Sequence, residues 1–469
     1  MPIINWFMNR AKLILLAIGF IVASEACVLM PYGYVGLLLF FVLVFILLPI
    51  DIEKFTMALS FAILFSGFFG SYLGVPGNEN IFLFRLLIPI HLVFFLFFVK
   101  KDWTRLRYVK GLFLLFVAFF IGMLATGFWA PQLGESVRYL YFIFEWLYVI
   151  FLCVYYIGNE RTYQLFTRGI MILYIGILGI GVWESLTGHH LSQSGSLFYE
   201  TTTSAFQPTG FQFNTNDFAS LLTILFPVVV MQLTTWKKKG WMLSGIICVG
   251  GVSMYLVIMT NSRLAMVVLL LEIFVLLFGW SKLWSFVSVY VIGMGTLLVS
   301  TFHSSGFVQN LLGMVLNSFT EKGDSTSARM QMYQASWDMI KESHFMGIGA
   351  GNLPLRLDAY MYGFERLSDN YWAPHNYWLE ALANGGLLAF LPLLAFFMVY
   401  FIFAARYWMR EKYSAVSAIP LLIGLAFVAA SIGLSSTIDK RHLSLGIGIG
   451  IGLAVLNIRY FQKGRSKQC

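Results

Sequence analysis

Long uninterrupted runs of apolar residues constrain this chain more than any other feature of its sequence. About fourteen runs, most of them close to 20 residues long, can each cross the hydrocarbon core of a bilayer as an α-helix. A transmembrane β-barrel would instead show segments of about 10 residues with alternating polarity. We therefore predict an all-α polytopic membrane protein with about 12 to 14 transmembrane helices. The runs cover residues 13–30, 32–50, 55–73, 81–99, 111–128, 139–157, 169–186, 217–235, 242–259, 264–280, 284–302, 376–404, 416–435 and 443–460.

The composition supports a membrane protein and fixes its expected orientation. Only 11% of the 469 residues are charged, whereas soluble domains have about 25%. The net charge of +9 does not indicate nucleic-acid binding, because most basic residues flank the apolar runs on one side. With basic loops at 100–110, 236–240 and 405–412 inside, the positive-inside rule predicts that both termini are cytoplasmic.

The expected domain organisation has three parts. Residues 1–302 form a bundle of about eleven spans, residues 303–375 form an extracytoplasmic loop with short helices, and residues 376–469 add further spans and a cytoplasmic tail. A shorter extracytoplasmic segment is expected near residues 188–215.

The extracytoplasmic loop has a pattern of its own. Ser327 or Thr326 is expected to cap a helix over residues 328–341, whose apolar face carries Met332 and Met339 and lies at the membrane interface. A glycine-rich turn at residues 347–351 follows, without the strand and helix that a dinucleotide-binding fingerprint requires.

Three polar residues at the expected outer ends of spans are the candidate catalytic residues. Arg263 opens a span, where a guanidinium can bind a phosphate through two hydrogen bonds, although such an arginine is often only an interfacial anchor. Arg329 lies in the expected first turn of the loop helix, where a bound anion would offset its conflict with the helix dipole. The alternative is a solvated surface arginine. His375 enters the next span and suits a general base, or it is an interfacial histidine at a helix start.

Other polar residues near these positions have two interpretations each. Asn376 can touch the substrate or cap a helix, and Glu380 can pair with His375 or with an arginine. Arg85 and Arg138 lie at outer ends of spans, so they either join an anion site or pair with acids inside the bundle. For these acids, pairing is the favoured interpretation; they are Glu25, Glu145, Glu184 and Glu272.

The sequence gives no indication of a metal site. Cys27, Cys153 and Cys248 lie inside apolar runs and Cys469 is the last residue, which excludes a cysteine cluster in the loop. The pair His189–His190 lacks a third ligand at a suitable spacing, and the loop has no paired aspartates. We expect no metal ion and no other cofactor.

Several short motifs together resemble the superfamily of O-antigen ligases and Wzy-type polysaccharide polymerases, which includes polymerases of the teichuronic acid type. The resemblance covers residues 210–400, whereas the first half matches only as a set of spans. Ligases of this family are usually drawn with about twelve spans, so a count of fourteen is nearer to the polymerases. The motifs are Asn214-Thr215-Asn216, Asn261-Ser262-Arg263, Ser327-Ala328-Arg329, residues 344–352, His375-Asn376 and Gly385-Gly386.

The resemblance implies a metal-independent, inverting glycosyltransferase of the GT-C type in the bacterial cytoplasmic membrane, with its active site on the extracytoplasmic face. The donor would be an undecaprenyl-diphosphate-linked glycan, and the acceptor a glycan or lipid. Arg263 and Arg329 would hold the diphosphate, with Asn376, Arg85 and Arg138 as further donor-binding residues. His375 would deprotonate or orient the acceptor hydroxyl.

Two other classes of protein remain as alternatives. A flippase for lipid-linked oligosaccharides would need inverted repeats or helices broken at the midplane, and neither is evident in the sequence. A scaffold of a polysaccharide assembly complex would tolerate substitution at all three candidate catalytic residues.

Overall fold

The structure is a computed structural model that describes residues 51–465, with gaps at 70–73, 76–77, 192–203, 284–285, 288–289, 291–322 and 363–373. Three of the predicted spans, 13–30, 32–50 and most of 284–302, lie outside the described residues, as does the first part of the predicted loop. All other predicted spans coincide with helices, so the all-α membrane architecture is confirmed. The count of fourteen and the GT-C-like arrangement remain predictions.

Nine of the described helical segments are long and apolar enough to cross a bilayer. Shorter apolar helices occur at residues 83–97 and 441–456. Antiparallel strands β1 (Gly74–Val75) and β2 (Asn78–Phe82) and the 3-10 helices η2 (Trp103–Leu106) and η3 (Thr126–Phe128) complete the described elements. The helices are α3 (Ile52–Ser66), α4 (Leu83–Phe97), α5 (Lys110–Ala125), α6 (Leu133–Tyr156), α7 (Glu160–Thr187), α9 (Thr215–Thr234), α10 (Lys239–Met259), α11 (Arg263–Trp280), α14 (Gly323–Glu342), α15 (Leu353–Tyr362), α16 (Tyr377–Arg410), α17 (Ala415–Gly433) and α18 (Arg441–Arg465).

The chain divides into two compact units. The first contains residues 1–59 and 90–101, and the second contains residues 60–89 and 102–469, so α3 and α4 each contribute to both. In the first unit, the rings of Phe55 and Phe94 make an edge-to-face contact at 5.1 Å. Everything described below lies in the second unit.

Helix α9 forms the centre of the second unit. It packs against α7, α10, α11, α17 and α18, and 94% of its span is buried by protein. By contrast, α16 is only 33% buried and exposes Leu387, Leu388 and Leu391. A helix that is apolar all round and enclosed by others belongs in the core, whereas exposed leucines on a spanning helix suit contact with lipid.

Segments predicted to lie on one side of the membrane meet at one end of the second unit. Gln132 at the start of α6 bonds to Asn352 of the loop, and Lys440 before α18 pairs with Asp217 at the start of α9. At the other end, predicted to be cytoplasmic, Gly279 of α11 lies against Ala415 of α17. The helix directions therefore agree with the predicted parity, and the orientation in a membrane remains a prediction.

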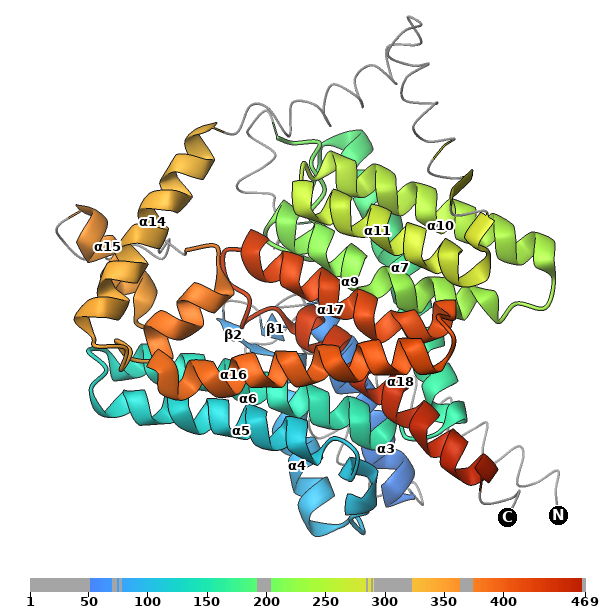
Figure 1. Cartoon of the computed structure of the whole chain (residues 1–469), viewed down its shortest axis with the longest axis horizontal. Coiled ribbons are helices and arrows are strands. Elements are labelled where there is room, and N and C mark those ends of the chain that lie inside the picture. The colour runs from blue at the N-terminus through green and yellow to red at the C-terminus, as the bar shows by residue number, and fades with distance from the viewer. Residues whose placement is uncertain are drawn as a thin grey trace, which may run out of the picture. The chain divides into compact units, whose positions relative to one another are not determined.

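The predicted loop helix exists, but it begins earlier than expected; its position at the membrane interface remains a prediction. Helix α14 begins at Gly323, so Ser327 lies inside the helix and does not cap it. Its polar first turn has no apolar periodicity to mark it in the sequence. The expected apolar face is present, with Met332 and Met339 buried, but part of it packs on α15 and α16 in a core that includes Met339 and Ala383. Figure 1 shows α14 and α15 beside the N-terminal part of α16.

Candidate functional site

The glycine-rich turn of the loop binds to a break in α16. Gly386 has φ 59° and ψ −168° inside the helix, a conformation that is essentially restricted to glycine. The backbone groups freed at the break bond to the loop instead: Leu387 N–H donates to Phe345, and Gly349 N–H donates to Asn384. The predicted turn is thus fixed to the membrane bundle through main-chain hydrogen bonds.

The other side of the same turn is fixed to η3, to the segment that follows it and to the start of α6. The Trp129 indole donates to the Gly347 carbonyl at 2.8 Å, and Ala350 N–H donates to the Thr126 hydroxyl at 2.9 Å. The Asn352 side chain accepts from Gln132 N–H and donates to Ser136. These buried, satisfied polar groups give the turn one defined position.

His375 is held in an uncommon backbone conformation immediately before α16. Its φ of 52° lies in the left-handed region, which histidine adopts more readily than most residues. The ring nitrogen Nδ1 is buried and has no hydrogen-bond partner within the described ranges. Burial lowers the pKa of His375, the positive charge of Arg329 lowers it further, and the main chain of Gly433 has the opposite effect. The ring therefore favours its neutral, proton-accepting form.

The two candidate arginines reach this region from different helices. Arg329 lies in the second turn of α14, not in the first turn as expected, because α14 begins at Gly323. It is close enough to His375 for its charge to act on the ring. Arg263 is the first residue of α11, and its neighbour Leu264 faces Gly433 at the end of α17. Gly433 is thus a common neighbour of His375 and of the start of α11.

The predicted donor-binding residues have other partners as well. The Asn376 side chain accepts hydrogen bonds from Trp378 N–H and Leu379 N–H, so the alternative prediction of a helix cap is confirmed. Arg85 pairs with Glu145 at 3.0 Å, as the pairing hypothesis proposed. Arg138 is largely exposed and lies 3.8 Å from Glu135. Donor binding by these three residues remains a prediction.

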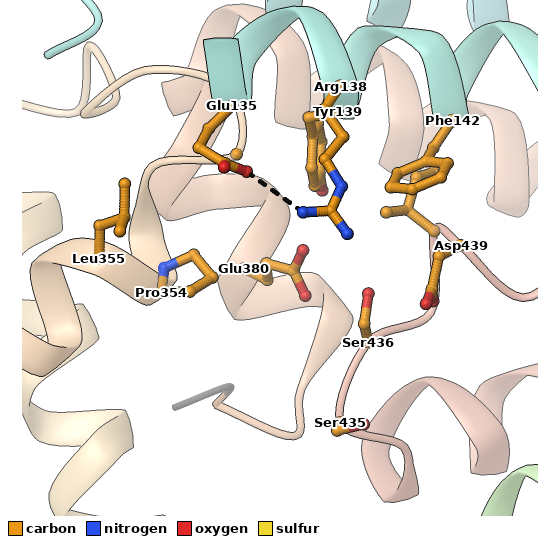
Figure 2. A pocket seen from close by; sticks show the side chains of 12 residues that line it. Glu135, Arg138, Tyr139, Phe142, Pro354, Leu355, Glu380, Ser435, Ser436 and Asp439 are labelled. Atoms are coloured by element: carbon orange, nitrogen blue, oxygen red, sulfur yellow. Dashed lines mark ion pairs between the residues drawn. The ribbon is translucent and has the colours of Figure 1, made fainter. Parts of the chain in front are cut away.

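A cavity of about 250 Å³, lined by both polar and apolar side chains, opens between the N-terminal turns of α6 and α16. In Figure 2, the Glu380 carboxylate and the Arg138 guanidinium point into it from opposite sides, and the Ser436 hydroxyl points into it from the segment after α17. Glu380 is only 6% exposed, and the Tyr139 hydroxyl beside it is buried without a hydrogen bond of normal geometry to any described residue. Its other lining residues are Glu135, Phe142, Gly351, Pro354, Leu355, Ser435, Ile438 and Asp439.

A cluster of charged residues lies near this cavity, but its charges already pair with one another. The two oxygens of Glu145 pair with Arg85 at 3.0 Å and with Arg441 at 3.2 Å. Both guanidiniums also lie over the Phe82 ring. Every charge in the cluster faces an opposite charge, so we interpret it as structural.

A lysine beside the cavity pairs with two aspartates. Lys440 pairs with Asp217 at 2.9 Å and with Asp439 at 3.1 Å. Burial alone would lower the pKa of Lys440, but the two aspartates raise it above its ordinary value. The lysine is therefore charged, and Asp439 keeps its Oδ1 buried without a hydrogen-bond partner in the described part of the chain.

The segment after α17 was missed as a functional region by reasoning from sequence. Residues 434–440 were treated only as a short connection between two spans. They contribute Ser435, Ser436 and Asp439 to the cavity. The signal available in the sequence was the polar stretch from Ser435 to Lys440 between two apolar runs. No cluster of metal-ligating side chains occurs among the described residues.

These features define a multi-pass, all-helical membrane protein with polar and charged side chains gathered at one end of the bundle. Residues 248–394, which include Arg263, Arg329 and His375, match the family model described as O-Antigen ligase (Wzy_C). The chain is also similar to the teichuronic acid biosynthesis protein TuaE of Bacillus subtilis (strain 168), with 26% identity over 360 residues, 74% of this chain and 71% of the relative. The chain is thus related to the O-antigen ligases and Wzy-type polymerases, as its motifs predicted, and this relationship supports an enzyme of polysaccharide biosynthesis in a membrane.

Proposed function

We propose that this protein is an integral-membrane glycosyltransferase that polymerises or ligates polyprenyl-diphosphate-linked glycan units on the outer face of the cytoplasmic membrane. The observation that carries the proposal is the environment of His375. The Nδ1 of its ring is buried without a hydrogen-bond partner among the described residues, and the ring lies within the electrostatic reach of Arg329. A neutral imidazole beside a fixed cation suits a base that accepts a proton close to a departing anion.

The proposed reaction is a single inverting displacement. The acceptor hydroxyl oxygen attacks the anomeric carbon of the donor sugar from the face opposite the diphosphate. As the new glycosidic bond forms, the hydroxyl proton passes to His375, and the bond between the anomeric carbon and the phosphate oxygen breaks. The electron pair of that bond leaves with the polyprenyl diphosphate.

Arginine side chains can supply the charge stabilisation that this leaving group needs. A guanidinium matches phosphate oxygens through two parallel hydrogen bonds and is always charged. In the proposal, Arg263 and Arg329 bind the diphosphate and stabilise the negative charge that it gains, without a metal ion. Asn376 would position His375 by starting the helix that follows it, because its side chain caps α16.

Replacement of the imidazole tests the proposal. His375→Ala should abolish polymer extension or transfer, because it removes the base, while the protein remains in the membrane at normal abundance. The measurement is the length distribution of the cell-envelope glycan in a deletion strain that expresses the variant, together with the accumulation of lipid-linked units. His189→Ala, at an exposed histidine on another segment expected outside, is the matched control.

The outcomes separate the proposed enzyme from its alternatives. Glycan of full length with His375→Ala would remove the catalytic role. In proteoliposomes, a transferase makes new glycosidic bonds from a radiolabelled lipid-linked unit, whereas a flippase only moves it between leaflets. A wild-type protein that moves the unit without extending it would contradict the proposal.

A further inference from the structure

We propose that the cavity lined by Glu380, Tyr139, Asp439 and Ser436, hereafter the Glu380 cavity, is a carbohydrate subsite. It would bind one monosaccharide unit of the glycan next to the bond that is formed. This inference rests on the proposed function, because it assigns part of the same substrate to a second group of residues. None of these four residues is needed for the displacement itself.

The size of the Glu380 cavity suits a single sugar ring. Its volume of about 250 Å³ lies just below the range of about 300–1,000 Å³ typical of sites for drug-sized ligands. One wall carries the aromatic rings of Phe142 and Tyr139, and the rest of the lining combines apolar side chains such as Leu355 and Ile438 with polar groups. A pyranose combines apolar C–H faces with a rim of hydroxyls, which this lining complements.

Several polar groups of the cavity can accept further hydrogen bonds. The Glu380 carboxylate is nearly buried and forms no ion pair with any described residue, in contrast to Glu145. Asp439 Oδ1 is buried without a hydrogen-bond partner among the described residues, and the Tyr139 hydroxyl lies beside the Glu380 carboxyl group. Buried polar atoms without partners are unfavourable, and sugar hydroxyls would supply the missing donors.

Two other kinds of ligand fit this cavity less well. A divalent cation needs several oxygen ligands directed at one point. Glu135, Glu380 and Asp439 do not form such a metal-binding group. A phosphate or other anion would meet three carboxylates, and the single guanidinium, Arg138, is 62% exposed and faces Glu135. A neutral polyhydroxylated ligand avoids both conflicts.

The cavity adjoins the environment of His375 along two segments of the chain. Glu380 lies in the first turn of α16, directly after His375 and its capping neighbour Asn376. Ser435 and Ser436 follow Gly433, whose main chain interacts with His375. A sugar bound in the Glu380 cavity would therefore be the immediate neighbour of the sugar that reacts.

A labelling experiment tests the subsite without requiring turnover. The full-length protein with Ser436→Cys, in a background where Cys27, Cys248 and Cys469 are replaced by serine and the buried Cys153 is kept, is reconstituted in proteoliposomes and labelled with a charged methanethiosulfonate reagent. Methyl glucoside, methyl N-acetylglucosaminide and methyl glucuronide serve as probes. A probe at about ten times its Kd should slow labelling about tenfold by mass action, and Glu380→Gln should remove this protection.

Steady-state kinetics would identify which substrate supplies the sugar. Glu380→Gln should raise, by about tenfold or more, the half-saturating concentration of one substrate, because one of the two carboxyl oxygens in the cavity is replaced by an amide nitrogen, which cannot accept a hydrogen bond. The lipid-linked unit from a deletion strain and a preformed short glycan are varied separately. The substrate whose KM moves is the one that occupies the cavity, while kcat changes less. Glu342→Gln, at an exposed acid on α14, is the control.

The possible results separate this inference from the proposed function. Labelling that no glycoside slows, with both KM values unchanged by Glu380→Gln, would overturn the subsite even if His375→Ala abolishes transfer. Protection by a glycoside that depends on Glu380 would support the subsite even if His375→Ala proved active, which would overturn the catalytic proposal alone. If the glutamine variant does not fold, Glu380→Asp takes its place in both experiments, after the purified protein is shown to be monodisperse.

Discussion

Two buried glutamates near the same end of the bundle have opposite environments. Glu145 of α6 is 2% exposed, and each of its carboxylate oxygens faces a guanidinium. Glu380 of α16 is 6% exposed, faces a cavity and forms no ion pair with the described residues. The comparison teaches that the presence of an acid within a span does not reveal its role. The role is revealed by whether other side chains already pair with the carboxylate.

The same comparison applies to the arginines. Arg85 and Arg441 are enclosed by Glu145 and by the Phe82 ring, so binding a phosphate would require them to leave existing partners. His375 retains a ring nitrogen without a partner among the described residues. We therefore assign structure to the cluster around Glu145 and chemistry to the region around His375 and Glu380.

Removal of Glu145 is the most severe way to test this comparison. Glu145→Ala removes the buried carboxylate that pairs with the two largely buried guanidiniums of Arg85 and Arg441, and removing one partner of a buried ion pair typically costs about 3–5 kcal/mol of folding free energy. We expect low abundance in the membrane and a clearly lower Tm of the purified protein, followed by tryptophan fluorescence in detergent. Glu342→Ala, which removes an exposed acid, should leave Tm unchanged. A Glu145→Ala protein with the wild-type Tm would contradict the structural assignment.

Adding a methyl group at the break in α16 should destabilise the protein less than Glu145→Ala does. In Gly386→Ala, the new Cβ would clash with the Phe345 carbonyl oxygen, and a backbone strain of about 1–3 kcal/mol is added. The turn at residues 343–352 should open about 10 to 100 times more often. Limited proteolysis with mass spectrometry measures this opening, and glycan transfer should fall with it.

The matched control for this substitution is another glycine in a helix. Gly179 lies in α7 with no atom within 4 Å of an added Cβ, so Gly179→Ala should change neither proteolysis nor transfer. Equal protection of residues 343–352 in the Gly386→Ala and wild-type proteins would show that the break does not hold the turn.

The parts of the fold that the sequence predicted follow from local patterns. Apolar length alone located the spans, and helical spacing alone located the buried face of α14 with Met332 and Met339. Asn376 before an apolar run predicted the cap that the structure contains. Each of these signals depends on residues within a few turns of one another, which is why single-sequence reasoning could detect them.

The remaining parts depend on contacts between distant segments. The Gly385–Gly386 pair was noted as a motif, but only the structure shows that the loop bonds to the backbone at this break. The bridge from Lys440 to Asp217 joins residues more than two hundred positions apart. No periodicity or capping rule encodes such a partner, so the polar stretch after α17 was indistinguishable from an ordinary loop.

The smallest expected effect concerns the pH dependence of transfer. The pKa of His375 is lowered first by burial and then by the charge of Arg329, so the neutral base persists to a lower pH than for an ordinary histidine. The rate should therefore fall only when the pH drops below the usual range for imidazole. Arg329→Gln removes one of the two lowering causes, so the pKa of His375 rises and the acid limb moves to higher pH.

The measurement is the initial rate of transfer in proteoliposomes across a pH series, with each profile scaled to its own plateau. Scaling separates the position of the acid limb from the loss of rate expected when an arginine proposed to bind the diphosphate is removed. Arg356→Gln, at an exposed arginine on α15, should leave the limb in place. A limb that does not move in Arg329→Gln would mean that His375 does not titrate in the transfer step, and the pairing of these two residues would lose its role in catalysis.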